Sequence, residues 1–174
     1  PRSTLFPYTT LFRSRGAEVY IADIAKEKLD YAVNTFQLKG SILNTSKEKL
    51  EEEVRRITNG NGFDVTIEAV GLPSTFQNCI DCAAYGGRVV LIGVGKKNLD
   101  FNFTIIQKKE LNIFGSRNAL KKDFLELIDL VKAGKVDLEK IVTNTYKLDE
   151  ADKAFKEFSE NAGSMLKVVI DFTK

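Results

Sequence analysis

The sequence contains no histidine and no tryptophan, and only two cysteines and three prolines in 174 residues. Without histidine the chain can supply neither a Ser-His-Asp triad nor an imidazole ligand for a metal. The two cysteines, Cys79 and Cys82, are too few for a structural zinc site, which takes four donors. We therefore predict that the chain carries no catalytic residue and no metal site of its own.

An excess of charge of one sign and long apolar runs are also absent. The 26 Lys and Arg residues and the 24 Asp and Glu residues are interspersed and leave a net charge of +2. They form no one-sided basic stripe of the kind that a nucleic acid requires. No apolar run approaches the roughly 20 residues of a membrane span. We therefore expect neither a nucleic acid nor a membrane as a partner.

The two cysteines stand in a Cys-x-x-Cys spacing, which can indicate a redox pair or a zinc site. They lie within residues 74–84, a mixed polar and apolar stretch that indicates a helix. Because free cysteine is usually a small buried residue, we predict two structural thiols. Unpaired thiols also suit the reducing cytoplasm, where we expect the protein to be found.

The first fourteen residues do not fit the pattern that follows them, since they show no helical or strand periodicity. Residues 4–14 resemble the one-frame translation of a common short-read sequencing adapter. We interpret residues 1–14 as a non-native, adapter-derived segment and leave them out of the fold prediction. The natural sequence is then expected to start near Arg15, in the middle of a domain.

From residue 16 onward, strand and helix patterns alternate, which is typical of a parallel sheet with helices on both faces. Short apolar runs predict strands at residues 18–22, 40–43, 64–70, 88–92 and 110–114. Apolar spacing predicts helices between them, one of which Thr45 and Glu48 would open as a capping box. The fold class is therefore predicted to be α/β, with a Rossmann-type doubly wound parallel sheet.

Asp23 stands directly after the first of these strands. An acidic residue at the end of the second strand of a Rossmann unit accepts hydrogen bonds from the adenosine ribose of NAD. It normally follows the glycine fingerprint by about 20 residues. We predict that Asp23 binds this ribose and that the first strand and its glycine loop are missing. The alternative is an Asp that only caps the next helix.

Glycines also follow three later strands, in the runs Ala69-Val70-Gly71, Ile92-Gly93-Val94-Gly95 and Phe114-Gly115-Ser116. Ligands of open α/β sheets bind outside the carboxyl ends of the strands. Glycine at that place lets a flat cofactor approach the backbone. Each glycine alone could be an ordinary turn, but together they predict a cofactor-binding surface.

The sequence resembles the zinc-dependent medium-chain alcohol and polyol dehydrogenases in a consecutive series of runs. These are RGAEVYIADIAKEKLDYA, FDVTIEAVG, GGRVVLIGVG, ELNIFGSRNAL, KIVTNTYKLDEADKAFKEF and LKVVIDF. The resemblance extends from Arg15 to Lys174 and is greatest to sorbitol, threonine and galactonate-type dehydrogenases. It implies hydride transfer between NAD and a secondary alcohol of a polyol, a sugar acid or a similar small molecule.

The resemblance also implies roles for particular residues. Asp23 would hold the adenosine ribose with Lys28 near it, and Arg117 would face the substrate. Phe114 would lie where the chain returns to the catalytic domain. The residues implied to line the nicotinamide side are Ala69, Val70, Ile92, Gly93 and Val94, with Gly71 as a further cofactor contact.

In this family the zinc ligands belong to an N-terminal catalytic domain that has no counterpart in this sequence. We therefore expect the C-terminal half of an enzyme, inactive alone, from a parent that carries zinc. Residues 15–114 would form a truncated NAD-binding domain. Residues 115–174 would form the C-terminal piece of a GroES-like catalytic domain.

Three alternatives stay open. One is a zinc-free quinone-reductase-like relative, and another is a non-catalytic nucleotide-binding module. The third is a methyltransferase, whose closing antiparallel hairpin is not supported by the helical pattern at residues 149–158. We also expect the parent to be a homo-oligomer, because apolar and polar residues alternate within residues 98–110 and an exposed apolar stripe usually marks an interface. Burial of that stripe within the subunit, under the missing domain, is the alternative.

Overall fold

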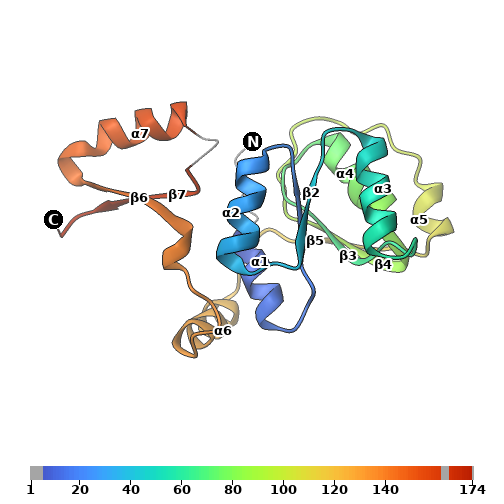
Figure 1. Ribbon diagram of the computed structural model, residues 1–174, viewed down its shortest axis with the longest axis horizontal. Helices are drawn as coiled ribbons and strands as arrows, with labels where there is room; N and C mark the ends of the chain where they lie inside the picture. The colour runs from blue at the N-terminus through green and yellow to red at the C-terminus, as the bar shows by residue number, and fades with distance from the viewer. Residues whose placement is uncertain (1–5, 162–164, 174) are drawn as a thin grey trace. The chain divides into compact units, whose positions relative to one another are not determined.

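The computed structural model describes residues 6–161 and 165–173 (Figure 1). Strands alternate with helices along the chain, as the sequence predicted from residue 16 onward. In chain order the elements are α1 (Phe6–Ser14), β1 (Tyr20–Asp23), α2 (Lys26–Phe36), β2 (Gly40–Leu43), α3 (Lys47–Ile57), β3 (Phe63–Glu68), α4 (Pro73–Cys82), β4 (Ala83–Leu91), α5 (Thr104–Lys108), β5 (Asn112–Gly115), α6 (Lys121–Lys132), η1 (Glu139–Ile141), β6 (Val142–Lys147), η2 (Leu148–Glu150), α7 (Ala151–Glu160) and β7 (Lys167–Asp171).

The described strands form three parallel sheets, β1–β2, β3–β4–β5 and β6–β7. The neighbours within the first two sheets are those expected of a Rossmann sheet, in which the second strand pairs with the third and the fourth, fifth and sixth pair in turn. Within the described residues, β1 and β3 each pair with one strand only. The predicted α/β fold with parallel strands is therefore confirmed.

The chain divides into two compact units. Residues 44–119 form one unit, which contains the sheet β3–β4–β5 with helices α3, α4 and α5. Residues up to 43 and from 120 onward form the other, which contains the sheets β1–β2 and β6–β7.

The core of the first unit lies around strand β4. Ile80, Val89 and Leu111 are buried there, and the rings of Phe76 and Phe101 meet edge to face with their centroids 5.1 Å apart. These apolar contacts place helix α4 against strands β3 and β4. The turns at the ends of those strands are thereby held on a packed base.

Residues 98–110 do not form the exposed apolar stripe that their alternation suggested. Phe101, Ile105 and Ile106 pack against the core of the unit, because residues 104–108 coil into helix α5. Leu99 and Phe103 remain exposed. Three of the five apolar side chains of this stretch are thus partly buried against the core of their own unit. Burial under the missing domain and the homo-oligomer both stay predictions.

The core of the second unit joins helix α2 to the segments that follow residue 120. Ile21, Leu29 and Phe36 are buried together with Ile141. The Tyr31 hydroxyl donates a hydrogen bond of 2.8 Å to the carbonyl of Lys140. Segments more than 100 residues apart in the sequence thus share one core.

Residues 6–14 form helix α1, although the sequence showed no helical periodicity there. The helix buries two polar side chains, those of Thr9 and Thr10, which are 2% and 4% exposed. An apolar pattern in the sequence therefore does not reveal which face is buried. Oγ1 of Thr10 has no hydrogen-bond partner among the described residues. Residues 1–5, including the first two of the adapter-like segment, lie outside the described residues.

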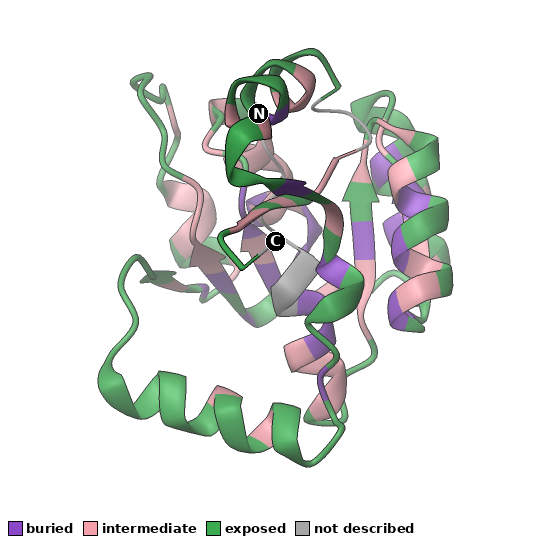
Figure 2. Cartoon of the chain, turned by 90° about the vertical axis from the view of Figure 1, so that its left-hand side faces the viewer, coloured by how far each residue is buried: buried purple, intermediate pink, exposed green. Residues whose placement is uncertain are grey.

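Helix α3 begins one residue later than the predicted capping box, and helix α6 is exposed along its length. The N-cap of α3 is Ser46 rather than Thr45, and its hydroxyl accepts a hydrogen bond of 3.3 Å from the backbone N–H of Lys49. Helix α6 buries none of its residues and is drawn almost entirely in the exposed colour in Figure 2. No helix among the described residues is long and apolar enough to span a membrane.

Candidate functional site

Two tight turns meet at the carboxyl ends of strands β3 and β4. We call residues 69–71 and 93–95 the glycine turns. Gly71 has a φ of +83°, and a Cβ built on it would lie 2.6 Å from the carbonyl carbon and oxygen of Val94. A Cβ on Gly93 would overlap the backbone nitrogen of Gly71. Only glycine fits at either position, because the two backbones approach too closely for a side chain.

The side chain of Glu68, which sequence reasoning had not singled out, joins the first glycine turn, residues 69–71, to helix α4. It is 4% exposed. Its Oε1 accepts hydrogen bonds from the backbone N–H groups of Val70 at 2.8 Å and Gly71 at 2.9 Å. It also accepts one from the hydroxyl of Thr75 at 2.6 Å. The signal in the sequence is an acidic residue in the last position of a strand, because a charge buried there needs hydrogen-bond partners.

The backbone of Glu68 reaches the second glycine turn. Its carbonyl oxygen accepts hydrogen bonds from the N–H groups of Ile92 at 2.8 Å and Gly93 at 3.0 Å. A Cβ on Gly93 would also overlap Oε2 of Glu68. One residue therefore connects both glycine turns and helix α4.

The remaining predicted residues of this unit lie at the same sheet edge or just beyond it. Phe114 pairs with Val90 in the register of β4 and β5, and its side chain is 49% exposed. The N–H of Ser116 donates to the carbonyl of Leu91 at 2.8 Å. Arg117 follows in an exposed segment. The structure thus brings Phe114 to the edge that carries the glycine turns.

Asp23 is the last residue of β1, as the ribose prediction requires, and belongs to the other unit. Its Oδ1 accepts a hydrogen bond of 2.9 Å from the backbone N–H of Ala25. The carboxylate is half-buried, and Lys28 lies on the first turn of α2. One carboxylate oxygen of Asp23 is thus held by the backbone of the loop that joins β1 to α2.

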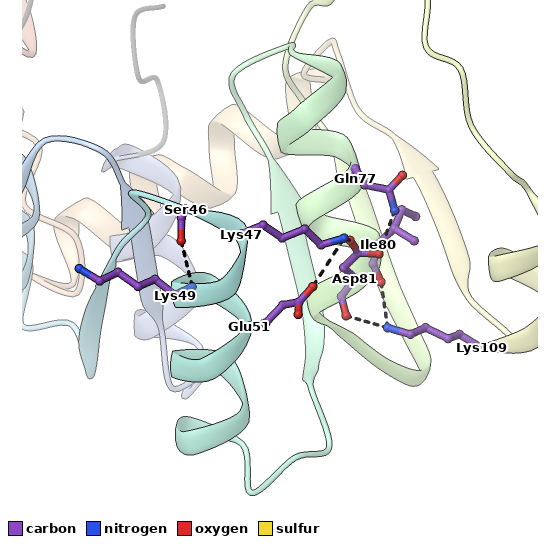
Figure 3. Close-up of polar contacts among 8 residues, drawn as sticks. All are labelled: Ser46, Lys47, Lys49, Glu51, Gln77, Ile80, Asp81 and Lys109. Carbon is purple, nitrogen blue, oxygen red and sulfur yellow. Dashed lines mark hydrogen bonds and ion pairs between the residues drawn. The ribbon is translucent and has the colours of Figure 1, made fainter.

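Helix α4 is fastened to its neighbours by polar contacts (Figure 3). Nζ of Lys47 lies 3.0 Å from Oδ2 of Asp81 and links α3 to α4. Oδ1 of Asp81 accepts from the side-chain amide of Gln77 at 2.8 Å. Nζ of Lys109 donates to three backbone carbonyls at the carboxyl end of α4 and just beyond it, those of Ile80, Asp81 and Ala83.

Both cysteines are free, and both lie on the inner side of α4. Burial, together with the nearby charge of Glu68, raises the pKa of the Cys79 thiol to about 12. Burial, together with Asp81, raises the pKa of the Cys82 thiol to about 11. Both thiols are therefore protonated at neutral pH, which fits the predicted structural role and makes them poor nucleophiles and metal ligands.

The donors needed for zinc are not assembled in the part of the chain that the structure describes. No group of three or more His, Cys, Asp or Glu side chains within residues 6–161 and 165–173 could hold a metal ion. The residues present do not fit a zinc site, and no chemical step is assigned to a metal here.

Comparison with known proteins agrees with this geometry. Residues 9–133 match the family model of the zinc-binding dehydrogenases, a match that includes residues 9–14 of the segment set aside above. L-galactonate-5-dehydrogenase of Escherichia coli (strain K12) is 27% identical over 160 residues, which are 92% of this chain and 46% of that protein. Sorbitol dehydrogenase 1 of Saccharomyces cerevisiae is 28% identical over 165 residues, 91% of this chain and 46% of that protein.

The fold agrees as well. The crystal structure of the alcohol dehydrogenase rspB from E. coli CFT073, a complex with NADH, superposes with a TM-score of 0.83 at 24% identity. The match covers 94% of this chain and 48% of that one. The chain spans about half the length of these relatives and matches their cofactor-binding part. This chain belongs to the zinc-binding family of medium-chain alcohol and polyol dehydrogenases.

Proposed function

We propose that this chain forms the NAD-binding half of an oxidoreductase that oxidises a secondary alcohol of a polyol, a sugar acid or a similar small alcohol. The observation that carries the proposal is the pair of glycine turns at the carboxyl ends of β3 and β4. Their backbones approach so closely that a Cβ at Gly71 or Gly93 would overlap them. This packing holds the two turns side by side at the carboxyl ends of parallel strands, which is where ligands of open α/β sheets bind.

In this proposal each predicted residue keeps a distinct task. Asp23 accepts hydrogen bonds from the adenosine ribose, for which its fixed Oδ1 and its place at a strand end are suited. Lys28 lies near the same ribose. The nicotinamide side is lined by Ala69, Val70, Gly71, Ile92, Gly93, Val94 and Phe114. NAD supplies the chemistry when bound, by accepting a hydride from the alcohol.

Substrate and zinc are bound by residues apart from the cofactor site. Arg117 faces the substrate in our proposal, and zinc is bound by an N-terminal catalytic half of the whole enzyme. We retain residues 15–114 as the NAD-binding domain and residues 115–174 as the return segment of a GroES-like domain, with residues 1–14 as foreign sequence. The two unpaired, buried thiols support a cytoplasmic enzyme.

A chimera tests the proposal. Residues 15–174 would be joined to the N-terminal half of the E. coli L-galactonate-5-dehydrogenase, and reduction of NAD would be followed with a panel of polyols and sugar acids. We expect hydride transfer from at least one secondary alcohol and its loss in the same chimera with Asp23→Ala at low NAD concentration. A folded, zinc-loaded chimera that reduces NAD with none of them would contradict the proposal.

A further inference from the structure

Glu68 is a buried carboxylate that the proposed function does not yet use. Three donors converge on its Oε1, namely two backbone N–H groups and the Thr75 hydroxyl. Thr75 itself lies in the first turn of the ten-residue helix α4. The carboxylate of Glu68 is thus held in one position by the turn that follows β3 and by the first turn of α4.

The charge of Glu68 acts on its surroundings as well as on the turns. It is the second cause, after burial, of the raised pKa of the Cys79 thiol. The negative charge of Glu68 disfavours a second negative charge on Cys79. By the same electrostatic interaction it favours a positively charged group bound against the glycine turns. The nicotinamide ring is positively charged in oxidised NAD and neutral in NADH.

We propose that Glu68 is a positioning residue that shapes the turn at residues 69–71, and that its buried negative charge favours binding of oxidised NAD over NADH. This inference rests on the proposed function, because the cofactor must lie against the glycine turns. The turn at residues 69–71 keeps its shape through the bonds to Oε1. Selectivity comes from the charge, which acts on one redox form of the ligand only.

The test measures the dissociation constants of NAD⁺ and NADH with the 174-residue chain by amide chemical-shift titration in the millimolar range. Glu68→Gln keeps the shape and the acceptor oxygen and removes the charge. For charges roughly 10 Å apart, with an effective dielectric between 20 and 80, the ratio Kd(NAD⁺)/Kd(NADH) should rise about two- to fifteenfold. Glu52→Gln removes a charge from an exposed position of the same unit and should leave the ratio unchanged.

Thr75→Val separates shape from charge. It removes the hydrogen bond to Glu68 and the one that the Thr75 hydroxyl accepts from the backbone N–H of Leu72, and should weaken binding of both redox forms by the same factor. Glu68→Asp keeps the charge and should hold the ratio within about twofold of wild type; it carries the test if Glu68→Gln does not fold. The inference would be overturned if Glu68→Gln left the ratio Kd(NAD⁺)/Kd(NADH) unchanged. It would also be overturned if Glu68→Asp, which keeps the charge, raised that ratio as much as loss of the charge is expected to. Neither result would contradict the proposed function. A wild-type chain that binds neither form would overturn the proposed function together with the inference.

Discussion

Nζ of Lys109 lies 2.8 Å from the carbonyl oxygen of Ala83 and donates a hydrogen bond to it. The same ammonium group satisfies the carbonyls of Ile80 and Asp81, at the carboxyl end of α4 (Figure 3). A cation at that end also opposes the helix dipole. Lys109 therefore connects the segment before β5 to the helix that supports the glycine turns.

Lys109→Met should lower the free energy of unfolding, because it leaves three carbonyls without their shared donor. Loss of a hydrogen-bonded charged partner costs roughly 1.5–3 kcal/mol. Urea denaturation followed by far-ultraviolet circular dichroism measures the change. Lys108→Met, at the exposed neighbouring position, is the matched control and should change stability by less than about 0.5 kcal/mol. Equal effects of the two variants would contradict the role of Lys109.

Thr10→Val should stabilise the chain. The hydroxyl of Thr10 is buried and has no partner among the described residues, and such a group costs roughly 1–3 kcal/mol. Valine has nearly the same shape and no polar atom to bury. Thr9→Val is the control, since Thr9 is equally buried but has an interaction to lose. Thermal unfolding of both variants gives the comparison, and a lower midpoint for Thr10→Val would show that α1 is packed differently.

The buried thiols should make stability depend on alkaline pH. The pKa of Cys79 is raised from an ordinary 9.0 to about 12 in the folded chain. Between these values the unfolded state releases a proton that the folded state retains, so the free energy of unfolding falls as pH rises above 9. Below pH 8 the thiol contributes no slope. Cys79→Ala should remove up to about 1.4 kcal/mol per pH unit of this decline; parallel wild-type and variant curves from pH 9 to 11 would exclude it.

Asp23→Ala should reduce discrimination against NADPH. The carboxylate bonds the ribose hydroxyls in our proposal and would repel a 2′-phosphate. Loss of a charged hydrogen-bonding partner, about 1.5–3 kcal/mol, corresponds to roughly 10- to 100-fold weaker binding of NADH. Calorimetric titration with both cofactors measures this, with Asp30→Ala on the exposed face of α2 as the control. Wild-type chain that already prefers NADPH would refute the ribose assignment.

The sequence predicted the parallel α/β fold and most strand positions, because β-branched runs and turn residues are local signals. It missed features that depend on packing. Residues 98–110 alternate like a strand, yet a short helix forms at residues 104–108 and packs Ile105 and Ile106, both partly buried, against the core. Ser46 caps α3 in place of its neighbour Thr45, since both residue types can do so.

The candidate site shows the same limit. Gly71 and Gly93 were predicted as places where a flat cofactor approaches the backbone, which stays a prediction. The structure gives another reason for glycine there, since the two turns pack against each other. Glu68 was missed although Val70, Gly71 and Thr75 follow it closely in the sequence, because no residue pattern marks a glutamate whose side chain folds back onto the turn after its own strand. Helix α1 was missed because its burial involves threonines, which carry no apolar pattern.

The most direct test of the account is to map where NADH binds on the ¹⁵N-labelled chain by amide chemical-shift perturbation. The account predicts the largest shifts at Asp23 and its loop, at residues 69–71 and 93–95, and at Phe114. Helix α7 and strand β7 should show none. Shifts confined to other segments, or no shift at millimolar NADH in a folded chain, would contradict the claim that this chain binds the cofactor.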